Sequence, residues 1–313
     1  MRTAIRRQSE PKPSVRDADA SSVRVVSQYA TGLSQLAERY DLFLVDQWGV
    51  LHDGQNPFPG VRACLRRLME IGKQVVILSN SGKPAPSNTK RLAEMGIEEA
   101  AYTELVTSGD VVRDLIARRD RLPYSALGSR CLFWGSEGGE VLLKGMQLQR
   151  TDALSDADFI LLAGVTDFHP LSHYERSLRL AVKRRIPLVC ANPDVVRFSK
   201  GELRFSAGEV ARLYQDMGGT VHFVGKPHPA IYDYCFRIMG GVEPERALAI
   251  GDSLSHDVLG GARAGVHTAF VCGGIHHEEF EGLETETRRL GVVARLGEDV
   301  GVQPHWVVPL FRW

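Results

Sequence analysis

The sequence has few cysteines, no net charge and no long hydrophobic run, and each absence excludes a class of protein. Its five cysteines lie far apart without a CxxC pair, which argues against a zinc or disulfide framework and favours reduced, buried thiols. Lys plus Arg and Asp plus Glu both number 38, so no overall charge attracts nucleic acid or an acidic membrane. Reduced thiols lead us to expect a cytoplasmic protein, and no apolar stretch is long enough to span a bilayer.

The beginning of the chain, residues 1–22, is polar and contains two prolines and several arginines. It lacks the apolar segment of a secretory signal, and Glu10, Asp17 and Asp19 argue against a transit peptide. We therefore expect a disordered extension at residues 1–22.

Apolar, strand-like runs alternate with helix-like segments along most of the chain. Leu42–Val45, Gln74–Leu78 and Ala247–Ile250 consist almost wholly of apolar residues, which is typical of strands buried on both faces of a parallel sheet. Val25–Tyr40 is expected to be a helix before the first of these strands. The alternation predicts an α/β fold with a doubly wound parallel sheet.

A middle section has its own strands and helices, so we expect an α/β domain inserted into the main sheet domain. The pattern of the first part resumes after this section. The last residues include Trp306, Phe311 and Trp313 and are too apolar to extend into solvent, so this tail is expected to dock. The predicted boundaries are 23–108 plus 206–300 for the core, 109–205 for the inserted domain and 301–313 for the docked tail.

Polar residues stand at the carboxyl ends of several predicted strands. They are Asp46, Ser79 with Asn80, Lys226 and Asp252. In a parallel sheet these ends share one edge, where open α/β sheets place their ligands. A nucleophilic carboxylate, hydroxyl and amide donors, a cation and a second carboxylate suit phosphoryl transfer assisted by magnesium.

The same residues resemble the motifs of the haloacid dehalogenase (HAD) superfamily, in their order along the chain. A further triplet is similar to a cap signature of the class IIA, NagD-like branch of that superfamily. The resemblance implies a HAD-like core with an inserted cap, and it extends over about Gln28–Gly274. The matching positions are Asp46, Ser79, Gly225-Lys226-Pro227, Gly251 to Asp257, and the cap triplet Asn192-Pro193-Asp194.

The resemblance implies a role for each matching residue. Asp46 would be the nucleophile and Lys226 the catalytic cation, while Ser79, Asn80 and Gly49 would bind phosphate. Mg²⁺ would be held by Asp46, the backbone carbonyl of Trp48, Asp252 and Asp257. Asn192 and Asp194 of the cap would lie near the substrate, a small phosphorylated metabolite. Class IIA relatives also often pair through their caps, which implies a homodimer.

One position departs from the family pattern. The residue two places after the nucleophile is usually an aspartate that protonates the leaving group and then activates water, and here it is Trp48. An indole N–H only donates a hydrogen bond and does not titrate usefully. His52 or Asp53 in the same loop could replace the aspartate, or nothing does.

Two functions therefore follow from the sequence. The first is a Mg²⁺-dependent phosphatase of a small phosphate monoester that uses an aspartyl-phosphate intermediate and is slow or selective for good leaving groups. The alternative is a catalytically impaired protein that binds a phosphorylated metabolite, which Trp48 favours. A receiver-like signalling domain also uses aspartate and lysine at strand ends, but the length of this chain and its inserted section argue against one.

Overall fold

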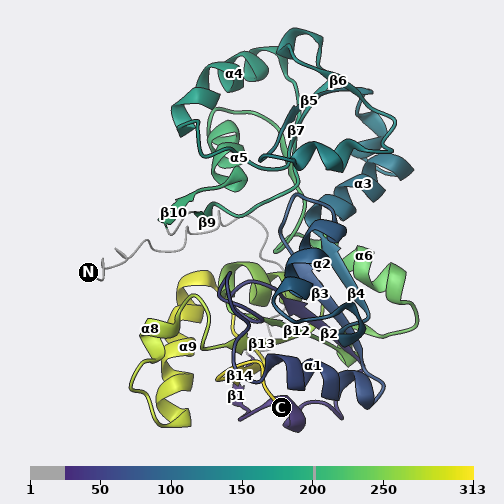
Figure 1. Cartoon of the computed structure of the whole chain (residues 1–313). Helices are drawn as coiled ribbons and strands as arrows, with labels where there is room; N and C mark the ends of the chain where they lie inside the picture. Colours follow the sequence, from purple (N-terminus) through teal and green to yellow (C-terminus); the bar gives the residue numbers. More distant parts are fainter. Residues whose placement is uncertain (1–24, 200–201) are drawn as a thin grey trace. The chain divides into compact units, whose positions relative to one another are not determined.

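The structure, a computed structural model, describes residues 25–199 and 202–313 (Figure 1). The extension expected at residues 1–22 lies outside the described residues. The chain forms two compact units, the first from Met1–Lys73 and Glu243–Trp313 and the second from Gln74–Val242. Among the described residues, no helix has the length and hydrophobicity needed to cross a membrane.

The first unit contains a parallel array of five strands. The inner strands are almost entirely apolar and buried, as expected for a parallel sheet covered on both faces. In spatial order the strands are β1 (Gln28–Tyr29), β14 (Trp306–Val308), β13 (His267–Val271), β12 (Ala247–Gly251) and β2 (Leu42–Asp46).

The helices of the first unit follow its strands along the chain. In the helix after β2, the buried residues recur at the three- and four-residue spacing of an amphipathic helix, at Val61, Cys64, Leu65 and Leu68. A short π-helical turn, η7 (Leu254–Val258), follows β12, and turns of this kind often occur at functional sites. The helices are α1 (Val61–Glu70), α7 (Leu259–Arg263), α8 (His277–Phe280) and α9 (Glu286–Val300).

The two ends of the described chain meet in this unit. The apolar tail forms β14, which lies between β1 and β13, and the indole N–H of Trp306 donates to the Tyr40 hydroxyl at 2.7 Å. The helix predicted over Val25–Tyr40 is wrong, because this segment forms β1 and a short 3₁₀ turn, η1 (Leu33–Gln35). Pairing of β1 with β14 overrides the local pattern, and a helical pattern does not reveal such a distant partner.

The second unit contains a parallel sheet of five strands and a parallel pair of strands. The pair is β3 (Gln74–Ser79) with β4 (Glu104–Thr107). The five-stranded order is β11 (Val221–Phe223), β8 (Leu188–Cys190), β7 (Phe159–Leu162), β5 (Arg130–Trp134) and β6 (Gln149–Thr151). An antiparallel hairpin adds β9 (Val196–Ser199) and β10 (Glu202–Phe205).

Helices of the second unit cover these strands. Tyr174 and Leu178 from one helix and Tyr214 from another share a hydrophobic cluster with Ile160 and Leu188 of the five-stranded sheet. Burial of such side chains stabilises the unit by about 1.5–3 kcal/mol each. The helices are α2 (Ala85–Glu94), α3 (Ser108–Arg118), α4 (Leu171–Arg184), α5 (Ala207–Asp216) and α6 (Pro229–Met239).

The segment after Ala207 lies elsewhere than its pattern predicts. The alternation places it back in the first sheet, but β11 pairs in parallel with β8, and α5 packs in the cluster of the five-stranded sheet. A short strand pattern does not specify which sheet the strand joins. The predicted domain boundaries, 23–108 plus 206–300, 109–205 and 301–313, remain our proposal for how the chain is divided functionally.

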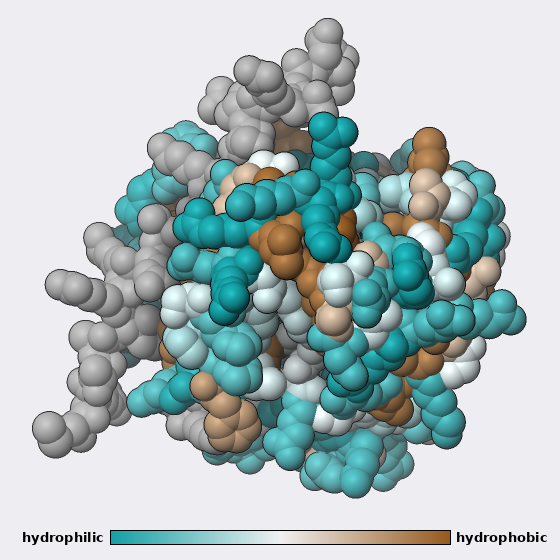
Figure 2. Space-filling model, turned by 90° about the horizontal axis from the view of Figure 1, so that it is seen from above, coloured by the Kyte–Doolittle hydropathy of each residue, from teal (hydrophilic) through white to brown (hydrophobic). Residues whose placement is uncertain are grey.

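The surface carries no extended apolar area on the face seen in Figure 2. Hydrophilic side chains cover most of this face, and the hydrophobic ones form small groups between them. Single exposed apolar residues, such as Phe168 and Leu122, are common on protein surfaces and do not by themselves indicate an interface. Dimerisation through the cap stays a prediction.

Candidate active site

A cluster of three carboxylates stands at the strand ends of the first unit. Asp46 is the last residue of β2, Asp252 directly follows β12, and Asp257 lies in η7. Because β2 and β12 are paired in parallel, with Val45 opposite Ile250, their carboxyl ends meet. One oxygen from each carboxylate lies within 4.8 Å of the others. The structure thus brings together the three aspartates that the sequence assigned to a metal.

Backbone groups hold this cluster in place. The N–H of Ile275 donates to Asp252 Oδ2 at 2.7 Å, and the N–H of Ser253 donates to Asp257 Oδ2 at 3.2 Å. Gly49, at φ +86°, and Gly274 approach the Asp252 carboxylate so closely that a Cβ on either would overlap it. Only glycine leaves room for the carboxylate at these two positions.

The donor set of the cluster fits a hard divalent cation. Asp252 and Asp257 are buried, and three negative charges at this spacing repel one another unless a cation compensates them. The ligand atoms are all carboxylate oxygens, which suit magnesium or calcium better than metals that prefer sulfur or imidazole.

The loop after Asp46 is closed by its own hydrogen bonds. The N–H of Gly49 donates to the His52 carbonyl at 2.9 Å, and that of Leu51 donates to the Gln47 carbonyl at 3.0 Å. Trp48 is 41% exposed. The metal contact predicted for the Trp48 carbonyl and the phosphate contact predicted for Gly49 both stay predictions.

His52 is buried inside this loop. Its Nδ1 accepts the N–H of Gly54 at 2.9 Å, so the neutral ring carries its proton on Nε2. Nε2 lies 3.1 Å from Gln47 Nε2, and Gln47 Oε1 has no partner among the described residues. Turning the Gln47 amide lets Oε1 accept the imidazole proton and pairs both groups. Both ring nitrogens then hold the loop closed, which leaves His52 poorly placed to replace the missing acid.

Asp53 caps its own turn. Its Oδ1 accepts the N–H groups of Asn56 at 2.7 Å and Gln55 at 2.8 Å. These bonds, that from Asn56 first, lower the pKa of the Asp53 carboxyl, which is therefore ionised at neutral pH. An exposed carboxylate with a lowered pKa is a poor proton donor, so this loop supplies no evident substitute for an aspartate at position 48.

The lysine loop of the second unit forms a separate group of predicted site residues. The N–H of Lys226 donates to Asn80 Oδ1 at 2.7 Å, and Asn80 Nδ2 donates to the Lys226 carbonyl at 3.1 Å. Asn80 Nδ2 also donates to Asp194 Oδ1 at 2.8 Å. Ser79 ends β3, directly before Asn80. Lys226 follows β11 of the five-stranded sheet, so the Asn80 side chain, not a common sheet, brings it to the end of β3.

The cap triplet takes part in this hydrogen-bonded group. Asn192 Oδ1 accepts the N–H of Asp194 at 3.1 Å and so shapes the turn that presents the Asp194 carboxylate to Asn80. Contacts of Asn192 and Asp194 with a substrate stay predictions.

Sequence reasoning missed several residues that build these groups. The buried Ser108 hydroxyl lies 3.4 Å from both the Ser79 carbonyl and Asn80 Oδ1. Its only sequence signal is a position just after the β4 strand pattern. Gly274 and Ile275, which hold Asp252, lie 22 and 23 residues beyond it, and a lone glycine gives no signal of so distant a contact.

Comparison with known proteins identifies the family. A model of the haloacid dehalogenase-like hydrolases matches residues 43–149, and a second, HAD-hydrolase-like model matches residues 223–298. Glycerol-3-phosphate phosphatase of Homo sapiens is 28% identical over 279 residues, 82% of this chain and 85% of the relative.

Two solved structures are also similar. A hydrolase of the haloacid dehalogenase-like family from Brucella suis 1330 has a TM-score of 0.75 and 28% identity, covering 90% of this chain and 99% of its own. NagD from E. coli K-12 has a TM-score of 0.64 at 20% identity over 87% and 96% of the two chains, a similarity of fold alone. These likenesses agree with the carboxylate cluster and with the parallel α/β architecture. The chain belongs to the haloacid dehalogenase-like hydrolases and is an enzyme of the phosphoric monoester hydrolase class.

Proposed function

We propose that this protein is a Mg²⁺-dependent, cytoplasmic phosphatase of a small phosphate monoester and that it works through an aspartyl phosphate on Asp46. The observation that carries the proposal is the cluster of Asp46, Asp252 and Asp257, which sets a nucleophilic carboxylate beside two further metal ligands. The family membership and the named activity of the human relative support the same reaction class.

In the proposed reaction, an Asp46 oxygen attacks phosphorus and the bond from phosphorus to the leaving oxygen breaks. The products are an acyl phosphate on Asp46 and an alkoxide or phenoxide, which takes a proton from water. Attack by water then releases inorganic phosphate and regenerates the carboxylate. Lys226 and Ser79 would stabilise the phosphoryl oxygens. Bound by the three carboxylates and the Trp48 carbonyl, Mg²⁺ would neutralise charge on the phosphate.

The tryptophan at position 48 determines which esters would react well. General acid–base catalysis is worth about 10²–10⁴-fold, and in this loop His52 is used to close the structure while Asp53 has a lowered pKa. Leaving groups that depart without a proton, such as phenolic, acyl or anhydride phosphates, should therefore be preferred. Glycerol 3-phosphate, named for the human relative, has a poor alkoxide leaving group and should be slow.

The nucleophile is tested by 4-nitrophenyl phosphate hydrolysis with and without Mg²⁺, for wild type and Asp46→Asn. We expect activity that requires Mg²⁺ and falls by at least about 10³-fold in Asp46→Asn. Asp299→Asn in α9, which is exposed, is the matched control and should behave like wild type. Retained activity in Asp46→Asn would refute the nucleophile assignment.

Leaving-group selectivity is tested with a series of aryl phosphates of graded phenol acidity. We expect kcat/KM to rise steeply with acidity, since no side chain of the Asp46 loop is placed to protonate the phenoxide. A flat dependence would show that another acid acts.

Accumulation of the aspartyl phosphate is tested by rapid acid quenching, which should trap a phosphorylated Asp46. We expect accumulation because the aspartate missing at position 48 would also activate the attacking water. If neither a kinetic burst nor a phosphoprotein is found, the intermediate does not accumulate.

The alternative is a protein that binds a phosphorylated metabolite and hardly turns it over. The observation that favours it is Trp48, which is 41% exposed and stands where the family usually carries its acid. Binding of inorganic phosphate with Mg²⁺, without hydrolysis of any aryl or acyl phosphate, would select this alternative.

A further inference from the structure

We propose that the side chain of Asn80 is a positioning group that fixes the Lys226 backbone and does not itself bind phosphate. The inference rests on the proposed function of Lys226 as the cation beside the phosphoryl group. It replaces the phosphate contact that the sequence predicts for Asn80.

The hydrogen bonds of the Asn80 amide carry the inference. A primary amide has two N–H donors and a carbonyl oxygen that accepts two bonds. Both donors are used inside the protein, one by Asp194 Oδ1 at 2.8 Å and the other by the Lys226 carbonyl at 3.1 Å. A phosphate oxygen needs a donor, and this amide has none left.

The carbonyl oxygen of the same amide is used as well. It accepts the Lys226 N–H at 2.7 Å and lies 3.4 Å from the Ser108 hydroxyl. The Asn80 amide thus forms hydrogen bonds with both the N–H and the C=O of Lys226, as a neighbouring β-strand would do. Two bonds to one peptide segment fix its direction, which one bond cannot do.

Packing around the amide leaves little room for another arrangement. Asn80 is 6% exposed and Lys226 is 4% exposed. Gly225 has φ +114°, and a Cβ there would overlap Ser108 Oγ and clash with Asn80 Oδ1 and Pro193 Cδ. The glycine before the lysine therefore allows the backbone to reach the amide.

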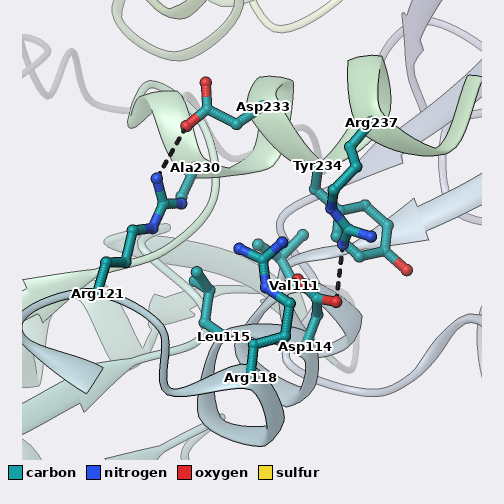
Figure 3. Close-up of a pocket in the computed structure, with 9 residues that line it drawn as sticks. All are labelled: Val111, Asp114, Leu115, Arg118, Arg121, Ala230, Asp233, Tyr234 and Arg237. Atoms are coloured by element: carbon teal, nitrogen blue, oxygen red, sulfur yellow. Dashed lines mark ion pairs between the residues drawn. The ribbon is translucent and has the colours of Figure 1, made fainter. Parts of the chain in front are cut away.

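The helices that carry these partners are also tied together. Helix α3 begins at Ser108, and α6 begins shortly after Lys226. Residues of both helices, with Arg121 just after α3, line a cavity of about 240 Å³. Arg237 of α6 pairs with Asp114 of α3 at 2.7 Å, and Arg121 pairs with Asp233 of α6 at 3.5 Å; Figure 3 marks both pairs. These partly exposed pairs are each worth no more than about 1 kcal/mol, but they join α6 to α3 and to the segment that follows α3.

The test is a double-mutant cycle in the full-length protein, measuring kcat/KM for 4-nitrophenyl phosphate with Mg²⁺. We expect Asn80→Ala to lose about 10²-fold, mostly in kcat, because a misplaced catalytic group can cost that much. In the Lys226→Ala background the same substitution should cost no more than about twofold, since Asn80 acts through the lysine. Independent, multiplicative losses would overturn the proposal and restore a direct phosphate contact.

A second readout follows the lysine without using activity. Acylation of Lys226 Nζ, mapped by peptide mass spectrometry, should be faster in Asn80→Ala than in wild type, because the lysine loop is released. Asn88→Ala in α2 is the matched control and should leave both kcat/KM and labelling unchanged. Unchanged Lys226 labelling in Asn80→Ala would overturn the positioning role.

The experiment also distinguishes a loss of folding in Asn80→Ala from a lack of effect in Lys226→Ala. If Asn80→Ala loses its cooperative thermal transition, Asn80→Asp takes its place, because it keeps the volume and loses both donated bonds. If Lys226→Ala keeps wild-type kcat/KM, the role of Lys226 is refuted and this inference with it. Asp46→Asn then shows separately whether the phosphatase proposal itself fails.

Discussion

The carboxylate cluster of the first unit and the lysine loop of the second unit are assembled in different ways. Asp46 and Asp252 stand where two paired parallel strands end, and backbone N–H groups and glycines fix the carboxylates. Lys226 follows a strand of the five-stranded sheet and is fixed by one side chain, Asn80. The first arrangement depends on strand pairing, while the second depends on a single amide.

This difference predicts how each group fails. Apart from proline, no substitution removes a backbone N–H donor, so the carboxylate cluster is disturbed mainly by adding atoms to it. The lysine loop can be released by removing one side chain.

An aspartate introduced at position 48 should restore the missing acid beside the carboxylate cluster. Trp48→Asp is expected to raise kcat/KM for glycerol 3-phosphate by about 10²-fold, since the new carboxyl can protonate an alkoxide. The gain for 4-nitrophenyl phosphate should be small, because its leaving group needs no proton. Steady-state kinetics on both esters check this. Trp48→Phe is the control; an equal gain there would mean that the indole merely obstructs the site.

Adding one methyl group beside Asp252 should weaken metal binding. In Gly274→Ala the new Cβ overlaps the Asp252 carboxylate, so the Mg²⁺ concentration for half-maximal activity should rise about 10–100-fold. A Mg²⁺ titration of the activity measures it. Gly291→Ala in α9, where a Cβ meets no atom within 4 Å, should leave the Mg²⁺ requirement unchanged. An unchanged requirement in Gly274→Ala would remove Asp252 from the metal site.

Removing the outer partner of Asn80 should have a smaller effect on the lysine loop. Asp194→Ala leaves one N–H of a buried amide without its acceptor, which costs about 1–3 kcal/mol. Part of that cost should appear as a fall of about tenfold or less in kcat, with an unchanged Mg²⁺ requirement. Kinetics and thermal unfolding are compared with Asp216→Ala, an exposed position in α5. A shifted Mg²⁺ requirement would contradict the separation of the two groups.

The free energy of unfolding should depend on pH because of His305, which lies just before β14, at the amino ends of the first unit's strands. Burial, and then the charge of His267, lower the pKa of His305 from 6.5 to about 4. Its Nδ1 accepts the Thr268 N–H at 3.1 Å, and its ring stacks on His267.

The sign of that dependence follows from the lowered pKa. Between pH 6.5 and 4 the unfolded chain binds a proton that the folded chain excludes, so this stability is complete above pH 6.5 and is lost as the pH falls to about 4. For a partly buried ring we expect a loss on the order of 2 kcal/mol. Urea unfolding at pH 7, 5.5 and 4.5 measures it, and His305→Asn should flatten the change. An equal slope in the variant would assign the effect to other groups.

Much of the architecture could be predicted from the sequence. Buried parallel strands read as continuous apolar runs, so β2, β3 and β12 were recognisable, and with them the positions of Asp46, Ser79 and Asp252. The sheet to which β11 belongs and the strand β1 could not be predicted. Both depend on pairing with a segment far along the chain, and a local sequence pattern does not indicate which distant segment a strand pairs with.

The residue types of the site, the strand ends that carry the carboxylates and the absence of an aspartate at position 48 can all be found in the sequence alone. These are local properties, since side-chain chemistry and strand pattern are written in consecutive residues. The three-dimensional fold was needed to show that the Asn80 amide bonds to both Lys226 and Asp194. It was also needed to show that His52 and Asp53 form hydrogen bonds within their own loop and turn, and that Gly274 lies against Asp252. Such roles depend on which polar groups meet when the chain is buried, because each buried donor and acceptor must find a partner.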